Sequence, residues 1–254
     1  ATTLDVNVGT GATGTLTFGT AAVSVDIIDV DGTGGDDVID INQDLTASGG
    51  AIAIATVSSI NIDASGARAL DAQNGSVLMN SSVGAITLDG GSNTVTIQSS
   101  TAGDNTVNLG ANITSATEAS LTLSSRGNIT LAGVDLYVST GGTLTATPDS
   151  DGSGVGTLTL NGNLDVGSIN FDGTGTNDVI DFTASNSVTA HSGSIDLDST
   201  NNSVTLSGSG ATVTITNSDA SDTAITIGAV DGDDSGAGNE ASLTLSGTGN
   251  ITTG

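Results

Sequence analysis

Several residue types are absent or scarce in this chain of 254 residues. It has no cysteine, no tryptophan and no lysine, and aromatic residues make up only 2% of it. Without cysteine there is no disulfide framework, so stability must come from backbone pairing and packing. With so few aromatic residues, the core must be aliphatic. No apolar run approaches the roughly 18 residues of a membrane-spanning helix, so we expect no membrane insertion.

Positive charge is almost missing. Beside His191, the only basic residues are Arg68 and Arg126, whereas 28 acidic residues give a formal net charge of −26. Binding to nucleic acid needs clustered Lys and Arg, so we expect no nucleic-acid partner. The same sign of charge argues against an anionic membrane surface. The chain begins at Ala1 within β-like sequence, as expected of a mature product or a fragment.

The scarcity of basic residues also bears on catalysis. Enzymes that cleave polysaccharides need either a base beside cations or a pair of shielded carboxylates. Arg68 and Arg126 lie in the Gly/Ser turns SGAR and SSRG, where we expect solvated side chains. His191 lies in TAHSG without a second histidine or a cysteine nearby, which indicates a surface histidine. We expect no catalytic residues and no enzymatic activity.

The residues that are present indicate an all-β chain. The abundance of Gly, Ser, Thr, Asn and Asp could signal disorder, but regular aliphatic runs argue against it. Runs such as AIAIATV at 51–57 and AITLD at 85–89 alternate apolar with small polar residues. This alternation is typical of half-buried strands. Clusters of Gly, Asn, Ser and Asp between the runs supply turns.

The chain repeats itself internally, with an offset that falls from 141 to 118 residues. The first copy holds 23 residues between Ile41 and Gly75 that the second copy lacks, about one coil of a stacked fold. A stack in which each coil contacts only its neighbours tolerates such a loss. The units are 14–155 and 156–254, and 1–13 completes a preceding unit. The matching pairs include GTLTF at 14–18 with GTLTL at 156–160, DGTGGDDVID at 31–40 with DGTGTNDVID at 172–181, and EASLTLSSRGNIT at 118–130 with EASLTLSGTGNIT at 240–252.

These features predict a parallel β-helix, or β-solenoid, that runs through 1–254 as one domain. An antiparallel sandwich is the alternative, but scarce aromatic anchors and the single Pro148 favour coiling. Val, Ile and Leu should fill the interior, with Phe18, Phe171 and Phe182 stacked inside it. Coils of ~20 residues give roughly twelve coils.

Three motifs resemble the repeats of filamentous-haemagglutinin-type exoproteins and related giant bacterial adhesins. They are GAITLDGGSNTVTI at 84–97, SLTLSSRGNITLAG at 120–133 and GSIDLDSTNNSVTL at 193–206. The resemblance implies a right-handed parallel β-helix that is exported to the cell surface. It also implies a role in adhesion, biofilm or cell contact, and it implies no catalytic residues.

Acidic loops suggest candidate metal sites. The stretch 29–40 holds five carboxylates, and crowded carboxylates repel one another unless a cation bridges them. GTGGDDVID at 32–40 and its copy at 173–181 resemble a calcium-binding nonapeptide, with departures at Thr33 and Thr176. DSDGSG at 149–154 and DGDDSG at 231–236 offer oxygen ligands without a closing Glu. Solvated turns and Ca²⁺ binding both stay open. The candidate ligands are Asp29, Asp31, Asp36, Asp37, Asp40, Asp149, Asp151, Asp172, Asp178, Asp181, Asp231, Asp233 and Asp234.

Threonine pairs suggest a further binding mode. T-x-T triplets begin at Thr15, Thr94, Thr143, Thr157 and Thr212. Threonines ranked on a flat solenoid face can organise ice-like water. The alternative is that threonine is simply a frequent outward residue of strands.

The two ends of the chain are similar to the interior of the repeat. No capping element is visible, and LDVNV followed by GTLTF near Ala1 continues the pattern that stops at GNITTG. Uncapped coils favour association through their edges. We expect an extracellular structural protein that is part of a head-to-tail filament on the cell surface or in a matrix, with itself as partner. An adhesin for glycans or a cell-surface ligand is the alternative, and an ice-binding solenoid is a further one.

Overall fold

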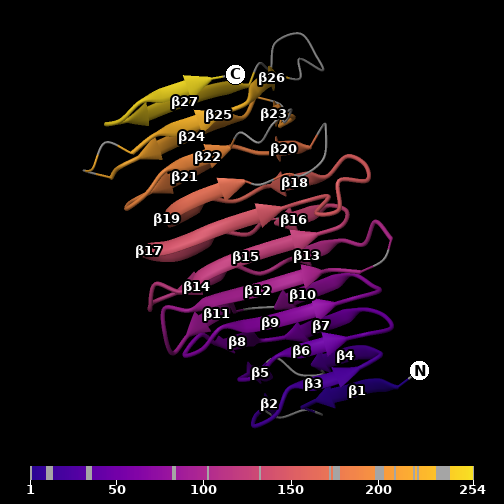
Figure 1. The fold of residues 1–254 in the computed structure, drawn as a ribbon. Helices are drawn as coiled ribbons and strands as arrows, with labels where there is room; N and C mark the ends of the chain where they lie inside the picture. The colour runs from indigo at the N-terminus through magenta and orange to yellow at the C-terminus, as the bar shows by residue number, and fades with distance from the viewer. Residues whose placement is uncertain are drawn as a thin grey trace.

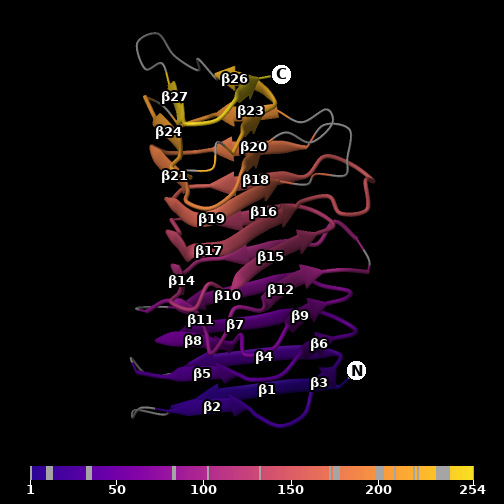
Figure 2. The same cartoon turned by 60° about the vertical axis from the view of Figure 1, so that its left-hand side comes forward.

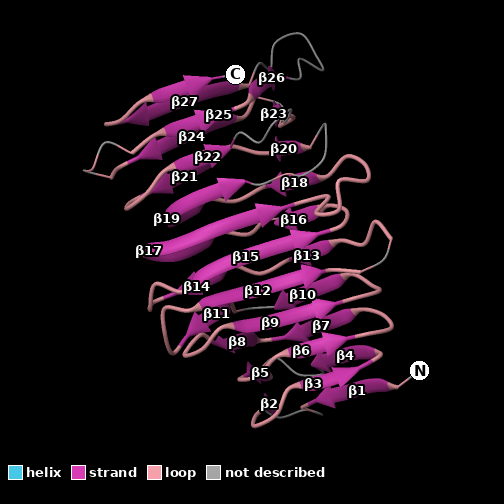
Figure 3. Ribbon diagram, viewed as in Figure 1, coloured by secondary structure: helices cyan, strands magenta, loops and turns pink. Residues whose placement is uncertain are grey.

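The computed structural model describes residues 2–9, 14–32, 36–81, 84–101, 103–131, 133–171, 173, 178–197, 203–208, 210–219, 221, 223–232 and 241–253. Every regular element in these ranges is a β-strand (Figure 3), and the strand pairs are parallel. Successive strands wind around one axis and stack into a rod, with the N-terminal coil at one end and the C-terminal coil at the other (Figure 1). The predicted all-β solenoid is confirmed.

Each coil contributes one strand to each of three parallel ladders (Figure 2). Ladder 1 contains β1 (Thr3–Val8), β4 (Ile27–Gly32), β7 (Ile52–Val57), β10 (Val77–Ser81), β13 (Val107–Leu109), β16 (Ile129–Leu131), β18 (Thr157–Leu160), β20 (Val179–Phe182), β23 (Ser203–Leu206) and β26 (Ala229–Gly232).

Ladders 2 and 3 form the second sheet. Ladder 2 contains β2 (Thr15–Phe18), β5 (Val38–Ile41), β8 (Ser59–Asp63), β11 (Ile86–Asp89), β14 (Ile113–Ser115), the first parts of β17 (Leu136–Thr147) and β19 (Leu164–Phe171), β21 (Asn186–Ala190), β24 (Thr212–Asn217) and β27 (Ser242–Gly247). Ladder 3 contains β3 (Val23–Val25), β6 (Leu45–Ala47), β9 (Arg68–Ala72), β12 (Thr94–Ser99), β15 (Ser120–Ser125), the remainders of β17 and β19, β22 (Ile195–Leu197), β25 (Ile225–Ile227) and β28 (Ile251–Thr253).

The number of coils is lower than predicted. Ladder 1 has ten strands, so the described chain makes about nine turns rather than roughly twelve. The reason is coil length. Val107 pairs with Ile129, 22 residues further on, but Val77 pairs with Val107, 30 residues further on. Turns of variable length lengthen the coil without disturbing the ladders.

The core is a set of aliphatic columns that follow the strand register. In ladder 2, one column stacks Ile39, Ile60 and Ile86, all with 0% exposure, and continues through Leu136 and Leu164. Alternation places these side chains inside and the intervening polar ones outside. The three phenylalanines are buried as predicted, but Phe18, Phe171 and Phe182 belong to ladders 2, 3 and 1 and form no single stack.

The internal repeat is displaced around the rod. Segments of the first copy on one ladder match segments of the second copy on the neighbouring ladder, because the copies are not separated by a whole number of coils. Four strands, β6 to β9, lie between β5 and β10, whereas β21 alone lies between β20 and β22. The first copy thus holds three additional strands, which is one coil. The matched strands are β2 with β18, β5 with β20, β10 with β22, β12 with β24, β13 with β25, β15 with β27 and β16 with β28.

Candidate functional site

Two of the candidate metal ligands are structural hydrogen-bond acceptors. Asp37 and its repeat counterpart Asp178 have 0% exposure. The Asp37 carboxylate accepts the backbone N–H of Gly14 at 2.9 Å, and the Asp178 carboxylate accepts that of Gly156 at 2.7 Å. Each aspartate satisfies a backbone amide one coil away, which is half-buried at Gly14 and buried at Gly156. The first aspartate of the DVID motif thus has the same role in both copies.

The DSDGSG loop buries its first carboxylate and leaves its second at the surface. Asp149 is buried and accepts the N–H groups of Ser153 at 3.1 Å and Gly154 at 3.0 Å. Burial raises the pKa of Asp149, and the neighbouring Asp151 and Asp178 raise it further against the effect of the N–H donors. Asp151 forms an ion pair with Arg126. These carboxylates already have partners within the protein.

The remaining candidate ligands are spread over different faces. Asp29 and Asp31 point outward from ladder 1, Asp40 from ladder 2 and Asp181 from ladder 1 six coils later, and Asp36 lies exposed in a turn. Asp172, Asp233 and Asp234, and the side chain of Asp231, lie outside the described residues. Within the part of the chain that the structure describes, no group of three or more His, Cys, Asp or Glu side chains could hold a metal ion.

The prediction of solvated arginines is wrong. The side chain of Arg68 is 15% exposed and that of Arg126 is 26% exposed. The Arg68 guanidinium lies 2.6 Å from the Asp63 carboxylate. The sequence conceals the Arg126 pair because its partner, Asp151, is 25 residues away, close to one coil length. Both arginines fix turns instead of facing free solvent.

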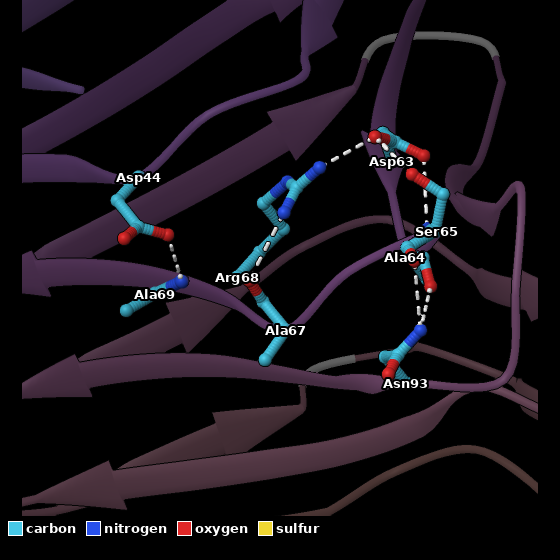
Figure 4. A network of polar contacts seen from close by, with 8 residues as sticks. All are labelled: Asp44, Asp63, Ala64, Ser65, Ala67, Arg68, Ala69 and Asn93. Carbon is cyan, nitrogen blue, oxygen red and sulfur yellow. Dashed lines mark hydrogen bonds and ion pairs between the residues drawn. The ribbon is translucent and has the colours of Figure 1, made fainter. Parts of the chain in front are cut away.

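Arg68 belongs to a polar network at the 2–3 corner, the set of turns that join ladder 2 to ladder 3 (Figure 4). Asp63 accepts the backbone N–H of Ser65 at 2.9 Å and its hydroxyl at 2.8 Å. These bonds, with the Arg68 contact, lower the pKa of Asp63. One coil before, Asp44 accepts the N–H of Ala69 at 2.9 Å and anchors the start of β9.

An open cleft lies along this corner over the first four coils. Its volume is about 600 Å³. The lining is mainly polar and includes Asp40, Asn42, Asn61, Arg68 and Asp89, which come from successive coils. Asn61 donates to Asp40 across the ladder at 2.8 Å. The cleft cannot be recognised in the sequence, because residues that line it are separated by whole coils.

The same corner holds a different arrangement in the C-terminal half. The His191 Nε2 atom contacts the carboxylate of Asp165, and its Nδ1 atom lies 2.9 Å from the hydroxyl of Ser218. The three residues come from three consecutive coils, with spacings of 26 and 27 residues. Both spacings are close to one coil length, so they place the three side chains at the same position in successive coils. Without the coil length, the sequence indicates no partner for His191.

The Asp165–His191–Ser218 chain has the residue types of a catalytic triad. A nucleophilic serine must give its proton to the imidazole. The Ser218 hydroxyl has one proton and lies 2.9 Å from the imidazole Nδ1 atom and 3.0 Å from the carbonyl of Ala190, so the carbonyl competes for that proton. The backbone N–H groups of His191, Ser192 and Gly193 all donate to the carbonyl of Gly167, so they offer no oxyanion hole. The arrangement fits a clamp between coils.

The threonine triplets do not share one face. Those beginning at Thr15 and Thr212 lie on ladder 2, the one at Thr157 on ladder 1, and those at Thr94 and Thr143 on ladder 3. On ladder 3, β15 lies between the last two, and Thr122 pairs in register with Thr96 and Thr145. A small hydroxyl grid results over three coils.

Comparisons with protein-family models, curated proteins and solved structures found no match for this chain. The fold is a β-solenoid, as the haemagglutinin-type resemblance implies, but no matching family model supports that identity. In the described residues, no helix is long and apolar enough to cross a membrane.

Proposed function

We propose that the chain is an extracellular structural β-solenoid that extends end to end with further coils of the same kind into a filament on the bacterial surface or in a matrix. The observation that carries this proposal is the continuity of the three ladders. In the described residues each has ten strands, counting the two parts of β17 and β19 separately. A second copy added after β28 would therefore begin on the ladder where β1 begins.

The outermost coils offer surfaces suited to such stacking. Aliphatic residues at core positions are only partly buried there, among them Leu4, Leu16 and Val23 in the first coil and Leu243 and Leu245 in the last. The strands of these coils pair on one side within the described chain. A further coil would cover the aliphatic surface and extend the hydrogen-bonded ladders. A contact between unlike ends that does not close propagates as a filament.

The net charge opposes this association, so the association should depend on salt concentration. A chain of charge −26 repels its copies, and salt screens that repulsion. We expect particles longer than one copy in electron micrographs and a rise in sedimentation coefficient as salt increases. Leu243→Asp, in the last coil, should shorten the particles. Leu78→Asp, at an exposed lateral site of 42% exposure, should leave their length unchanged.

Either of two results would contradict end-to-end growth. One is a particle of single-copy length at high protein and salt concentration. The other is loss of association in Leu78→Asp but not in Leu243→Asp, which would indicate lateral contact. Circular dichroism of both variants checks that the solenoid is folded. The mass of the intact polypeptide distinguishes a tandem array from polymerised subunits.

A second candidate, ice binding, is favoured by the hydroxyl grid on ladder 3. Neighbouring strands are about 4.8 Å apart and alternate residues about 6.6 Å apart, which gives a regular lattice of hydroxyl groups. If this lattice orders water, the chain shows thermal hysteresis that Thr122→Tyr abolishes and Thr159→Tyr, on ladder 1, does not. Absence of hysteresis in the unmodified chain rejects this candidate. The grid is formed by Thr94, Thr96, Ser120, Thr122, Thr143 and Thr145.

A further inference from the structure

The cleft at the 2–3 corner has a rigid wall. Asn93 donates to the carbonyls of Ala64 and Ser65, both at 3.0 Å, and so ties the loop after β8 to the next coil (Figure 4). Gly90 has a φ of +87°, and a Cβ there would lie 2.6 Å from an oxygen of Asp63. A glycine is required for this close approach. The wall is thus held before any ligand arrives.

Several polar groups at the cleft have no partner within the described protein. The side-chain amides of Asn42 and Gln43 make no intramolecular hydrogen bond there, and one oxygen of Asp89 is also unengaged, since the other accepts the N–H of Gly90 at 2.7 Å. Asn61 uses its amide nitrogen on Asp40 and leaves its oxygen available. Both donors and acceptors therefore face a single preformed cleft.

The chemistry of the lining limits the ligand. The polar lining does not suit an apolar ligand, for which burial of apolar area would have to supply the affinity. Three carboxylates, Asp40, Asp63 and Asp89, face one cation, Arg68, which Asp63 already neutralises. An anionic ligand would be repelled. Hydroxyl groups match the site, because they donate to carboxylates and exchange hydrogen bonds with amides.

We propose that this cleft binds a neutral oligosaccharide. Its sugar hydroxyls donate to Asp40 and Asp89 and pair with the amides of Asn42, Gln43 and Asn61. The cleft extends across several coils, so it suits a chain of sugars lying along the rod axis. The proposal goes beyond the filament function and does not rest on it, since a single copy contains the whole cleft.

Asp63 is not suited to act as the acid in glycoside hydrolysis. Glycoside hydrolysis requires one carboxyl group that holds a proton and acts as the acid. The hydrogen bonds from Ser65 and the contact with Arg68 lower the pKa of Asp63, which keeps this carboxyl charged. Its oxygens are also occupied by these donors. The groups that recognise the sugar are therefore the neighbouring carboxylates of Asp40 and Asp89 and the amides beside them.

The test uses the whole chain and neutral tetrasaccharides of glucose, xylose, mannose and N-acetylglucosamine, followed by saturation-transfer NMR and calorimetry. We expect at least one of them to bind, and Asp89→Ala and Gln43→Ala each to weaken that binding roughly tenfold. Asp29→Ala is the matched control, because it removes an outward aspartate from ladder 1, away from the cleft. The Asp29→Ala variant should bind the tetrasaccharide with the same affinity as the unmodified chain.

Three results would overturn the proposal. The first is that none of the neutral tetrasaccharides binds. The second is binding that Asp89→Ala and Gln43→Ala leave unchanged while their melting temperatures show an intact fold. The third is that Ca²⁺ alone, or a tetragalacturonate, binds and depends on Asp89 while the neutral sugars do not. Particle length is measured on the same samples, so failure of sugar binding and failure of filament growth are separate outcomes.

Discussion

The 2–3 corner is built on the same ladders along the whole rod, yet its two halves differ in chemistry. In the N-terminal half it holds a cleft with Arg68 on one wall. In the C-terminal half it holds the Asp165–His191–Ser218 chain, which ties three coils together at the surface. The backbone pairing is parallel in both halves. The difference must therefore come from the turns.

Turn sequence, not turn length, accounts for the contrast. In the N-terminal half, β8 ends at Asp63 and β9 begins at Arg68, and in the C-terminal half β21 ends at Ala190 and β22 begins at Ile195, so both turns hold four residues. The first turn leads into Arg68, which lines the cleft, whereas the second begins with His191, which contacts the coils on both sides of it. In this fold the ladders supply the scaffold and the turns supply the chemistry.

If the scaffold is the same in both halves, substitutions of core residues in the two halves should lower the free energy of unfolding by equal amounts. Ile60 and Leu164 belong to the same column of ladder 2 and are buried. We expect Ile60→Ala and Leu164→Ala each to lower the free energy of unfolding by about 2–5 kcal/mol. Leu245→Ala, in the partly buried end of that column, should cost less. Chemical denaturation measures all three, and a clearly cheaper Leu164→Ala would mean that the C-terminal core is looser.

The buried aspartates provide a second, smaller comparison between the halves. Asp37→Ala and Asp178→Ala each leave a glycine N–H without its acceptor. We expect each to cost about 1–3 kcal/mol of unfolding free energy. Asp36→Ala, at the exposed neighbour, is the control and should change stability by less than about 0.5 kcal/mol. Repeating the melts with Ca²⁺ and with chelator separates this role from metal binding. Stabilisation by Ca²⁺ that Asp37→Ala removes would contradict it.

The smallest predicted effect is a difference in pH dependence. The pKa of Asp63 is lowered from 3.8, so its contribution to stability is present above pH 3.8 and is lost as the pH falls through the lowered value. The pKa of Asp149 is raised from 3.8, so the folded state binds its proton more tightly, and stability declines as the pH rises from 3.8 through the raised value.

Unfolding measured across acid and neutral pH checks both signs. Asp63→Asn should lose stability relative to the unmodified chain only above the acid range, by less than about 1 kcal/mol because the site is partly exposed. Asp149→Asn should remove the decline that begins above pH 3.8. If the two variants changed the pH dependence in the same direction, the assigned environments would be wrong.

The sequence was sufficient to predict the fold class. Alternation in runs such as 51–57 reports directly on which side chains face the core, and AIAIATV forms β7 with Ile52 and Ile54 fully buried. The coil count was overestimated, because alternation says nothing about how many residues each turn holds. A coil of 30 residues at Val77 and one of 22 at Val107 have similar strands.

The polar sites could not be predicted for the same reason. Whether Asp165 meets His191, or Asp37 meets Gly14, depends on adding the turn lengths between them. An error of one residue in that sum moves a side chain to the opposite face of the sheet. The acidic motif at 32–40 also has two roles within four residues, since Asp37 points inward to an amide and Asp40 outward to the cleft.

Because the repeat is displaced by one ladder, the rod presents the same motif on different sides. A strand sequence that faces one side in the first copy faces the next side in the second, as β5 and β20 do. A third copy with the same displacement would face the remaining side. Duplication in this chain thus lengthens the rod and also increases the number of sides on which the same motif is presented.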